Sequence, residues 1–135
     1  LAMKTKFQIL AILALLIGTG TKSFAQEISW TAPEYSNSLQ NPFVGNQKAT
    51  DEGKIIFNQM CVLCHGNKGQ GNGQAGLTLE PRPANFTALN VMNQTDGAIF
   101  WKITNGKAPM ATYFEILTDD QRWKLVNYIR QLEKK

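Results

Sequence analysis

The sequence has few of the residues that build metal sites and disulfide frameworks, with two cysteines and one histidine in 135 residues. Because tetrahedral zinc takes three or four protein ligands, and no second cluster could complete the shell, this count argues against a zinc site. Convincing strand-like alternation of apolar and polar residues is also lacking, and no segment repeats another. The chemistry of the chain therefore depends on the one short segment in which its cysteines and histidine occur together.

Long apolar runs are scarce as well, and the longest lies at the beginning of the chain. Lys4 and Lys6 precede an apolar run over residues 7–17, and residues 23–25 supply small side chains at positions −3 and −1 of a cleavage site. This pattern predicts a signal peptide over residues 1–25 and export to the periplasm. The alternative is a membrane anchor, but the run is shorter than the ~20 residues that cross a bilayer, and no second one follows. We therefore expect no stable membrane insertion after cleavage.

The basic charge of the chain belongs mostly to this leader. The formal net charge is +4, and Lys4, Lys6 and Lys22 contribute three of the fourteen basic residues. The remaining eleven basic and ten acidic residues leave a mature charge near +1. No basic patch interleaved with aromatic residues remains, so the charge pattern argues against a nucleic-acid partner.

The most informative motif is Cys61-Val62-Leu63-Cys64-His65. On a helical turn, Cys61, Cys64 and His65 occupy positions i, i+3 and i+4 and share one face. The two thiols can then form thioethers with the vinyl groups of a porphyrin, and the imidazole can bind its iron as an axial ligand. The motif predicts one covalently attached haem c. The alternatives are a structural disulfide beside an incidental histidine, or a thioredoxin-like centre, which needs a βαβ context that the sequence lacks.

Three helices are predicted. The first begins at Thr50 with acidic residues in its first turn and carries a buried stripe that leads into Cys61. The second runs from about Thr95–Asp96 to Asn105–Gly106. The third begins with a capping box at residues 118–121. The stripe of the first helix consists of Ile55, Ile56, Phe57 and Met60.

The third helix has the clearest amphipathic pattern, which predicts one apolar and one polar face. The apolar face contains Trp123, Leu125, Val126, Tyr128, Ile129 and Leu132. The polar face contains Arg122, Lys124, Asn127, Arg130 and Gln131.

Two segments show little periodicity. Residues 26–47 contain prolines, glycine and spaced aromatic residues, which predicts an extended arm that packs against the domain. Residues 66–76 carry five glycines, which we expect to let the backbone pass close to the porphyrin edge. A phosphate-binding loop is the weaker alternative, since no Lys-Ser/Thr pair follows.

Three methionines compete for the second axial position of the iron. Met60 is adjacent to the cysteines on the histidine side of the ring, so core packing explains it better. Met92 precedes the second helix in a polar loop, where it could lie on the surface or fill a gap. Met110 follows Pro109 in a loop between two helices and is far enough along the chain to reach the opposite face. Met110 is therefore the predicted thioether ligand, with a packing role as its alternative.

Taken together, these residues resemble the class I cytochrome c family over about residues 49–132. The resemblance implies a small all-α, cytochrome c-like fold of three to four helices wrapped around one covalently bound haem. It also implies His and Met on opposite faces of the iron, and a proline carbonyl, from Pro81 or Pro83, that accepts a hydrogen bond from the proximal imidazole. The matching elements are Cys61 to Gly66, Gly69 to Gly73, a Pro-containing segment, Pro109-Met110, Trp123, and Leu125 to Arg130.

The expected domain order is a signal peptide (1–25), an N-terminal extension (26–47) and a cytochrome c domain (48–135). The expected function is that of a periplasmic monohaem cytochrome, not an enzyme, that carries single electrons from a quinol-oxidising complex to a terminal oxidase or reductase. One alternative is a haem-bearing subunit held permanently in a larger oxidoreductase complex through its N-terminal arm. The other is a haem enzyme or sensor with a displaceable sixth ligand.

Overall fold

The computed structural model describes residues 30–134, and the predicted signal peptide lies outside them. Helices and loops make up this part of the chain, and its only β-type pairing is an isolated bridge between Lys107 and Met110. No helix among residues 30–134 is long and apolar enough to span a bilayer. The all-α prediction is therefore confirmed. In chain order the elements are η1 (Glu34–Ser38), α2 (Gln47–Met60), α3 (Val62–His65), η2 (Gly76–Thr78), α4 (Leu89–Met92), α5 (Asp96–Asn105) and α6 (Asp119–Leu132).

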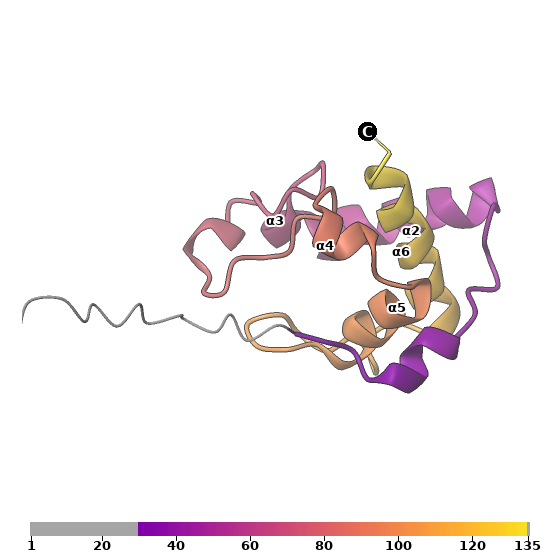
Figure 1. Ribbon diagram of the computed structural model, residues 1–135. Helices are drawn as coiled ribbons and strands as arrows, with labels where there is room; N and C mark the ends of the chain where they lie inside the picture. The colour runs from indigo at the N-terminus through magenta and orange to yellow at the C-terminus, as the bar shows by residue number, and fades with distance from the viewer. Residues whose placement is uncertain (1–29, 135) are drawn as a thin grey trace, which may run out of the picture. The chain divides into compact units, whose positions relative to one another are not determined.

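The packing of α2 against α6 forms the centre of the fold (Figure 1). Phe57 of α2 and Leu125 and Val126 of α6 are almost fully buried between them. The two backbones come very close at Gly53, where an added Cβ would lie 1.9 Å from the carbonyl oxygen of Lys124. A glycine is required here because any side chain would overlap backbone atoms of the other helix.

The predicted ends of the two later helices are correct, and that of the first is not. Thr95 caps α5, and Gly106 ends it with a φ of +62°. Thr118 and Gln121 form the capping box of α6. By contrast, α2 begins at Gln47, where the side chain of Asn46 accepts a hydrogen bond from the amide of Ala49. Thr50 lies inside the helix, so the prediction of a start at Thr50 is wrong by one turn.

The apolar face of α6 is confirmed, since all six of its predicted residues are buried. Two predicted polar residues of α6, Arg122 and Asn127, are buried as well. On α2 the predicted stripe is only partly correct, because Ile55 is 57% exposed and Met60 is 41% exposed. A helical pattern thus located the main core but not the buried polar groups.

The N-terminal arm packs against its own domain, as predicted. Asn127 donates a hydrogen bond to the carbonyl of Phe43 (2.6 Å) and accepts one from Asn41 (2.7 Å). Trp101 donates to the hydroxyl of Tyr35 (2.9 Å). The arm is not uniformly extended, because η1 forms a short helix that contacts α5.

Candidate haem site

Cys61, Cys64 and His65 lie together on one helical turn. Cys61 closes α2 and opens α3, and its carbonyl oxygen accepts hydrogen bonds from the amides of Cys64 (3.2 Å) and His65 (2.8 Å). All three side chains are half-buried. The spacing in the sequence therefore produces the i, i+3, i+4 arrangement that thioether attachment and axial ligation need.

Both cysteines are free thiols, which counts against the disulfide alternative. Burial, with a smaller contribution from Cys64, raises the pKa of Cys61 to about 12. A redox centre of the thioredoxin type needs a cysteine whose pKa is lowered, because the thiolate is the nucleophile. The environment of Cys61 acts in the opposite direction.

His65 is oriented by a backbone hydrogen bond. Its Nδ1 lies 3.1 Å from the carbonyl oxygen of Ala84, and since a carbonyl only accepts, Nδ1 carries the proton. Burial lowers the pKa of His65, although this hydrogen bond opposes the shift, and a neutral ring keeps the lone pair of Nε2. The expected partner, the carbonyl of Pro81 or Pro83, is therefore corrected to that of Ala84.

A second contact fixes the plane of this imidazole. The ring of Phe86 stacks on it with centroids 4.6 Å apart and an interplanar angle of 17°. The amide of Phe86 in turn donates to the carbonyl of Gly69 (2.7 Å). Such outer contacts determine which nitrogen faces a metal and at what angle.

The glycine-rich loop has a role that the sequence analysis did not predict. The amides of Gly71, Gly73 and Ala75 donate to the carbonyls of His65, Cys64 and Leu63, at 2.9, 3.1 and 3.0 Å. These are the carbonyls that the short helix α3 leaves without an intrahelical partner. A Cβ on Gly73 would lie 2.4 Å from the carbonyl oxygen of Leu63, so only glycine permits this approach. The loop thereby holds the backbone of the cysteine–histidine turn.

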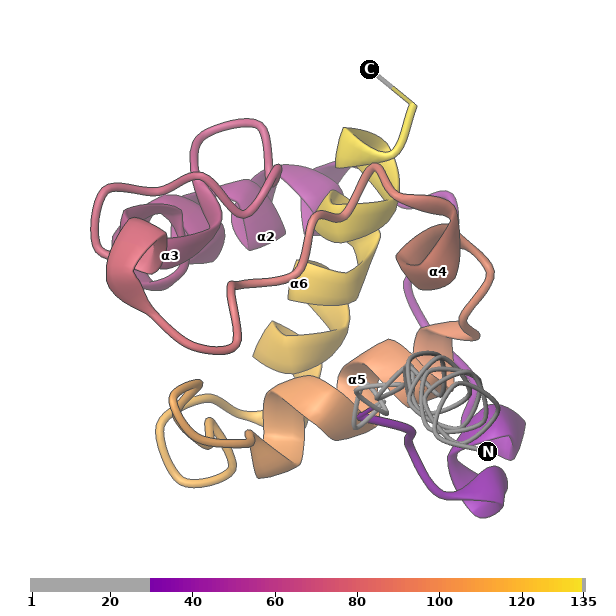
Figure 2. The same ribbon diagram turned by 60° about the vertical axis from the view of Figure 1, so that its left-hand side comes forward.

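Met110 belongs to the loop between α5 and α6. Its backbone pairs with that of Lys107 through two hydrogen bonds of 2.8 and 3.1 Å, and its side chain is half-buried. Both ribbon views place α3 and this loop on the same side of α6, one above the other (Figures 1 and 2). A direct contact joins the two regions, because the hydroxyl of Tyr113 donates to the carbonyl of Met60 (3.3 Å), next to Cys61.

The other two methionines have different surroundings. Met60 ends α2 on the cysteine side and is 41% exposed, so it is not the core residue that the sequence predicted. Met92 is the last residue of α4 rather than part of a loop, and its carbonyl accepts a hydrogen bond from Arg130 (3.2 Å).

The donor set of the site fits haem c. It comprises two free thiols three residues apart and a neutral imidazole with one free nitrogen, and a thioether lies in a loop tied to the same region. Within residues 30–134, no group of three or more His, Cys, Asp or Glu side chains could hold a bare metal ion. Covalent attachment through sulfur and one axial imidazole is the chemistry that these residues can support.

The model of the family described as cytochrome c oxidase, cbb3-type, subunit III matches residues 48–129. The chain belongs to this family of c-type cytochromes. Membership confirms the resemblance to class I cytochromes c and, with it, a covalently bound haem and a role in electron transfer. The match begins within α2 and ends within α6, so it includes both segments that carry the predicted ligands.

Among solved structures, the chain is similar to one from the reducing HAO-like protein complex of Kuenenia stuttgartiensis. The TM-score is 0.58 and the sequence identity 25%. The likeness covers 70% of this cytochrome but only 46% of that chain, so this cytochrome spans about half of its neighbour's length. No curated protein matches the sequence.

Several residues of the site were not predicted. Ala84 follows Pro83 directly, so the expected carbonyl was one residue away if it was that of Pro83 and three residues away if it was that of Pro81. Phe86 and Tyr113 are aromatic residues in loops without periodicity, and nothing in the sequence pairs them with His65 or Met60.

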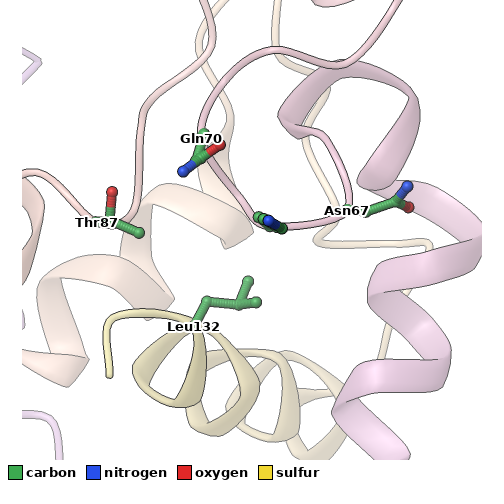
Figure 3. A pocket seen from close by; sticks show the side chains of 5 residues that line it. Asn67, Gln70, Thr87 and Leu132 are labelled. Carbon is green, nitrogen blue, oxygen red and sulfur yellow. The ribbon is translucent and has the colours of Figure 1, made fainter. Parts of the chain in front are cut away.

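A separate small pocket lies between the loop after His65 and the end of α6 (Figure 3). It is lined by Asn67, Lys68, Gln70, Thr87 and Leu132, and it contains none of the predicted ligands.

Proposed function

We propose that this protein is an exported monohaem cytochrome c that carries single electrons in the periplasm and is not an enzyme. The observation that carries the proposal is the link between two distant segments: the hydroxyl of Tyr113 lies 3.3 Å from the carbonyl of Met60. This hydrogen bond brings the loop of Met110 to the turn that bears Cys61, Cys64 and His65.

In this proposal Cys61 and Cys64 hold the haem through thioethers, and His65 and Met110 bind its iron. The haem supplies a one-electron couple between ferrous and ferric iron. The protein orients His65 through Ala84 and Phe86, which keeps the same imidazole nitrogen directed at the metal in both oxidation states. A fixed ligand geometry keeps reorganisation small, which favours rapid electron transfer.

The proposed ligands also support a role without substrate chemistry. With both axial positions occupied, no coordination site is open to a substrate. His65 is the only histidine in the sequence, so none is left to act as a distal acid or base. A neutral thioether from Met110 stabilises ferrous iron more than an anionic ligand would, and it should raise the reduction potential.

We infer that the partners are redox proteins, a quinol-oxidising complex as donor and a terminal oxidase or reductase as acceptor. The family and the similarity to a chain from a redox complex both support partners of this kind. That similarity also keeps permanent assembly as a second candidate. The arm is already bonded to its own domain through Asn41, Phe43 and Tyr35, which makes it a poor tether for another subunit.

The assignment of Met110 can be tested in the mature holoprotein by Met110→Ala. We expect loss of the weak near-infrared absorption that marks sulfur bound to ferric haem iron, a lower midpoint potential, and binding of CO by the ferrous form. Met92→Ala is the matched control, since it removes a half-buried thioether from the end of helix α4. An intact mass one haem above that of the polypeptide establishes the stoichiometry.

The ligand assignment, the covalent attachment and the role as a free carrier can each be contradicted by a separate result. An unchanged spectrum and potential in Met110→Ala would reject Met110 as ligand, and the same changes in Met92→Ala would transfer the role to Met92. A mass equal to that of the bare polypeptide after maturation would reject covalent attachment. Elution in a large complex from a native extract, without any free small protein, would favour the subunit over the carrier.

A further inference from the structure

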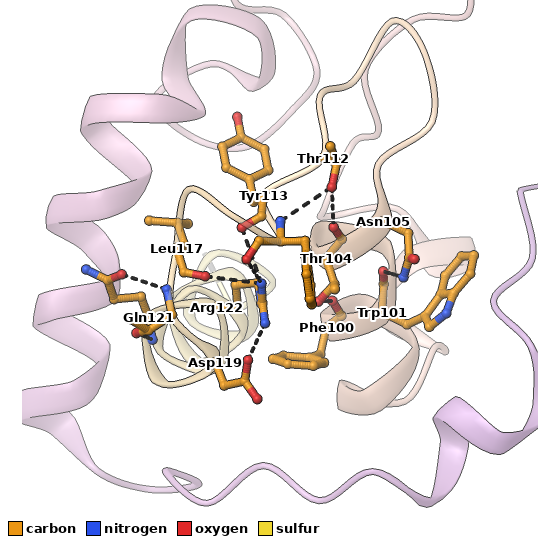
Figure 4. A network of polar contacts seen from close by, with 12 residues as sticks. Phe100, Trp101, Thr104, Asn105, Thr112, Tyr113, Leu117, Asp119, Gln121 and Arg122 are labelled. Carbon is orange, nitrogen blue, oxygen red and sulfur yellow. Dashed lines mark hydrogen bonds and ion pairs between the residues drawn. The ribbon is translucent and has the colours of Figure 1, made fainter.

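Arg122 is the most deeply buried charged residue among residues 30–134, with 2% of its surface exposed. It lies in the first turns of α6, on the face that the sequence pattern predicted to be polar. Its guanidinium points into the loop that precedes the helix (Figure 4). A buried cation is costly unless it is well paired, so its partners indicate what it does.

Three of those partners are carbonyl oxygens of the loop that follows Met110. Nη1 of Arg122 donates to the carbonyls of Phe114 (2.9 Å), Leu117 (3.1 Å) and Tyr113 (3.3 Å). Figure 4 shows the three bonds converging on one nitrogen. One side chain thereby fixes the path of the backbone over residues 113–117, beginning three residues after Met110.

The remaining contacts hold the guanidinium itself in place. Nη2 pairs with the carboxylate of Asp119. The guanidinium carbon lies 5.2 Å from the ring centre of Phe100 and 5.5 Å from that of Phe114, both within the range of cation–π attraction. Phe100 in turn stacks on Trp123 with centroids 4.0 Å apart. The cation is thus held between α5, α6 and the loop.

The same stretch of loop is also attached to α5. The hydroxyl of Thr112 donates to the carbonyl of Thr104 (2.6 Å), and the amide of Tyr113 donates to that of Ile103 (3.2 Å). Tyr113 is therefore bonded through its amide to α5, through its carbonyl to Arg122, and through its hydroxyl to Met60. Tyr113 lies three residues after Met110, so these bonds limit the positions that the loop of Met110 can take next to the cysteine–histidine turn.

We propose that Arg122 is a positioning residue for the sixth ligand: its bonds to the carbonyls of residues 113, 114 and 117 keep the Met110 loop closed against the iron. The inference rests on the proposed function, in which Met110 is that ligand. Arginine can make these bonds because its two terminal nitrogens donate to the carbonyls and to Asp119 at the same time, whereas lysine has a single nitrogen. Loss of the fork lets the loop open and frees the sixth position part of the time.

The chain offers a matched control on the same helix. Arg130 lies eight residues further along α6 and also binds backbone and carboxylate oxygens, those of Met92, Gln94 and Asp96. Arg130→Lys should therefore cost comparable stability while leaving the Met110 loop intact. The pair of variants separates local positioning of the ligand from a general loss of stability.

The experiment compares Arg122→Lys, Arg122→Gln, Arg130→Lys and Met110→Ala as mature holoproteins. For Arg122→Lys we expect about a tenfold rise in the rate of CO binding to the ferrous form, because the rate follows the population of the open loop. The near-infrared sulfur absorption should weaken and the midpoint potential should fall. Arg122→Gln should do more, and Arg130→Lys should match the parent in all three measurements.

The outcomes separate the two proposals. If Met110→Ala leaves the sulfur absorption unchanged, Met110 is not the ligand and the proposed function fails, whatever Arg122 does. Suppose instead that Met110→Ala abolishes the sulfur absorption, while Arg122→Lys and Arg122→Gln fold and retain the absorption, midpoint potential and CO-binding rate of the parent. Only the positioning role of Arg122 is then overturned. The same conclusion follows if Arg130→Lys changes the three readouts equally, or if neither Arg122 variant accumulates with haem, since the role of Arg122 would then be in folding.

Discussion

Substitution of Gly53 by alanine tests the central packing of this fold. Alanine ordinarily stabilises a helix interior relative to glycine, by roughly 1 kcal/mol. Here the new Cβ would lie 1.9 Å from the carbonyl oxygen of Lys124 and 2.5 Å from its carbonyl carbon. Both atoms belong to the backbone of α6, so no side-chain rotation can relieve the overlap, and the helices must move apart.

The expected net effect is destabilising. Overpacking a close contact typically costs about 1–3 kcal/mol. The new Cβ would lie about 1 Å closer to the backbone oxygen than real Cβ atoms do, so we expect a cost of about 3 kcal/mol or more. After subtraction of the gain in helix propensity, we expect the free energy of unfolding to fall by about 2 kcal/mol. For a domain of this size, that corresponds to a melting temperature lower by roughly 10 °C.

Urea unfolding followed by far-ultraviolet circular dichroism measures this difference. Asn58→Ala is the matched control, because it places alanine on an exposed position of the same helix and should change stability by less than about 0.5 kcal/mol. At low temperature the folded variant should keep the visible spectrum of the parent, since Gly53 is not a predicted ligand. Unfolding of Gly53→Ala at the same or a higher urea concentration than the parent would refute the close approach of α2 and α6.

Two further predictions concern buried and paired polar groups. Asn127→Ala removes the hydrogen bond that Asn127 donates to the carbonyl of Phe43 and the one that it accepts from Asn41, so the free energy of unfolding should fall by about 2 kcal/mol in the same urea assay. A change below about 0.5 kcal/mol would contradict the anchoring of the arm by Asn127. A hydrogen bond from Lys124 lowers the pKa of Glu52, so the carboxylate stabilises the fold above its ordinary pKa of 4.5, and this contribution is lost as the pH falls. The urea midpoints of the parent and Glu52→Gln should therefore differ at neutral pH and converge in acid, and a constant difference would rule out this linkage.

The features that the sequence predicted well are those encoded within one turn of the chain. Thr95 and Gly106 bound α5, and Thr118 with Gln121 opens α6, because caps are made by residues three or four positions apart. The placement of Cys61, Cys64 and His65 on one turn is local in the same sense. Asn46 was missed in favour of Thr50, since the side chains of both residue types can cap a helix.

The features that it missed depend on contacts between distant segments. Arg122 and Asn127 lie on the predicted polar face of α6, yet both are buried, because the loop after Met110 covers one and the arm covers the other. A helical pattern predicts which face of a helix packs against the core. It does not predict that a loop or an N-terminal arm also covers the opposite face. The carbonyl of Ala84 was expected at Pro81 or Pro83 for a related reason: a proline marks a bend in the chain but does not reveal which oxygen faces His65.

Helix α6 relates the two sides of the proposed iron site. Its apolar face packs against α2, which ends directly before Cys61, and Arg122 on the same helix binds the loop that follows Met110. In the proposed site, one helix therefore contacts both the segment that leads into the cysteine–histidine turn and the loop of Met110. Substitutions on α6 should accordingly fall into two groups. Substitutions that disturb the contact with α2, as Gly53→Ala does from the α2 side, should lower stability while Met110 stays bound to the iron. Substitutions of Arg122 should instead release Met110 from the iron in a protein that is still folded.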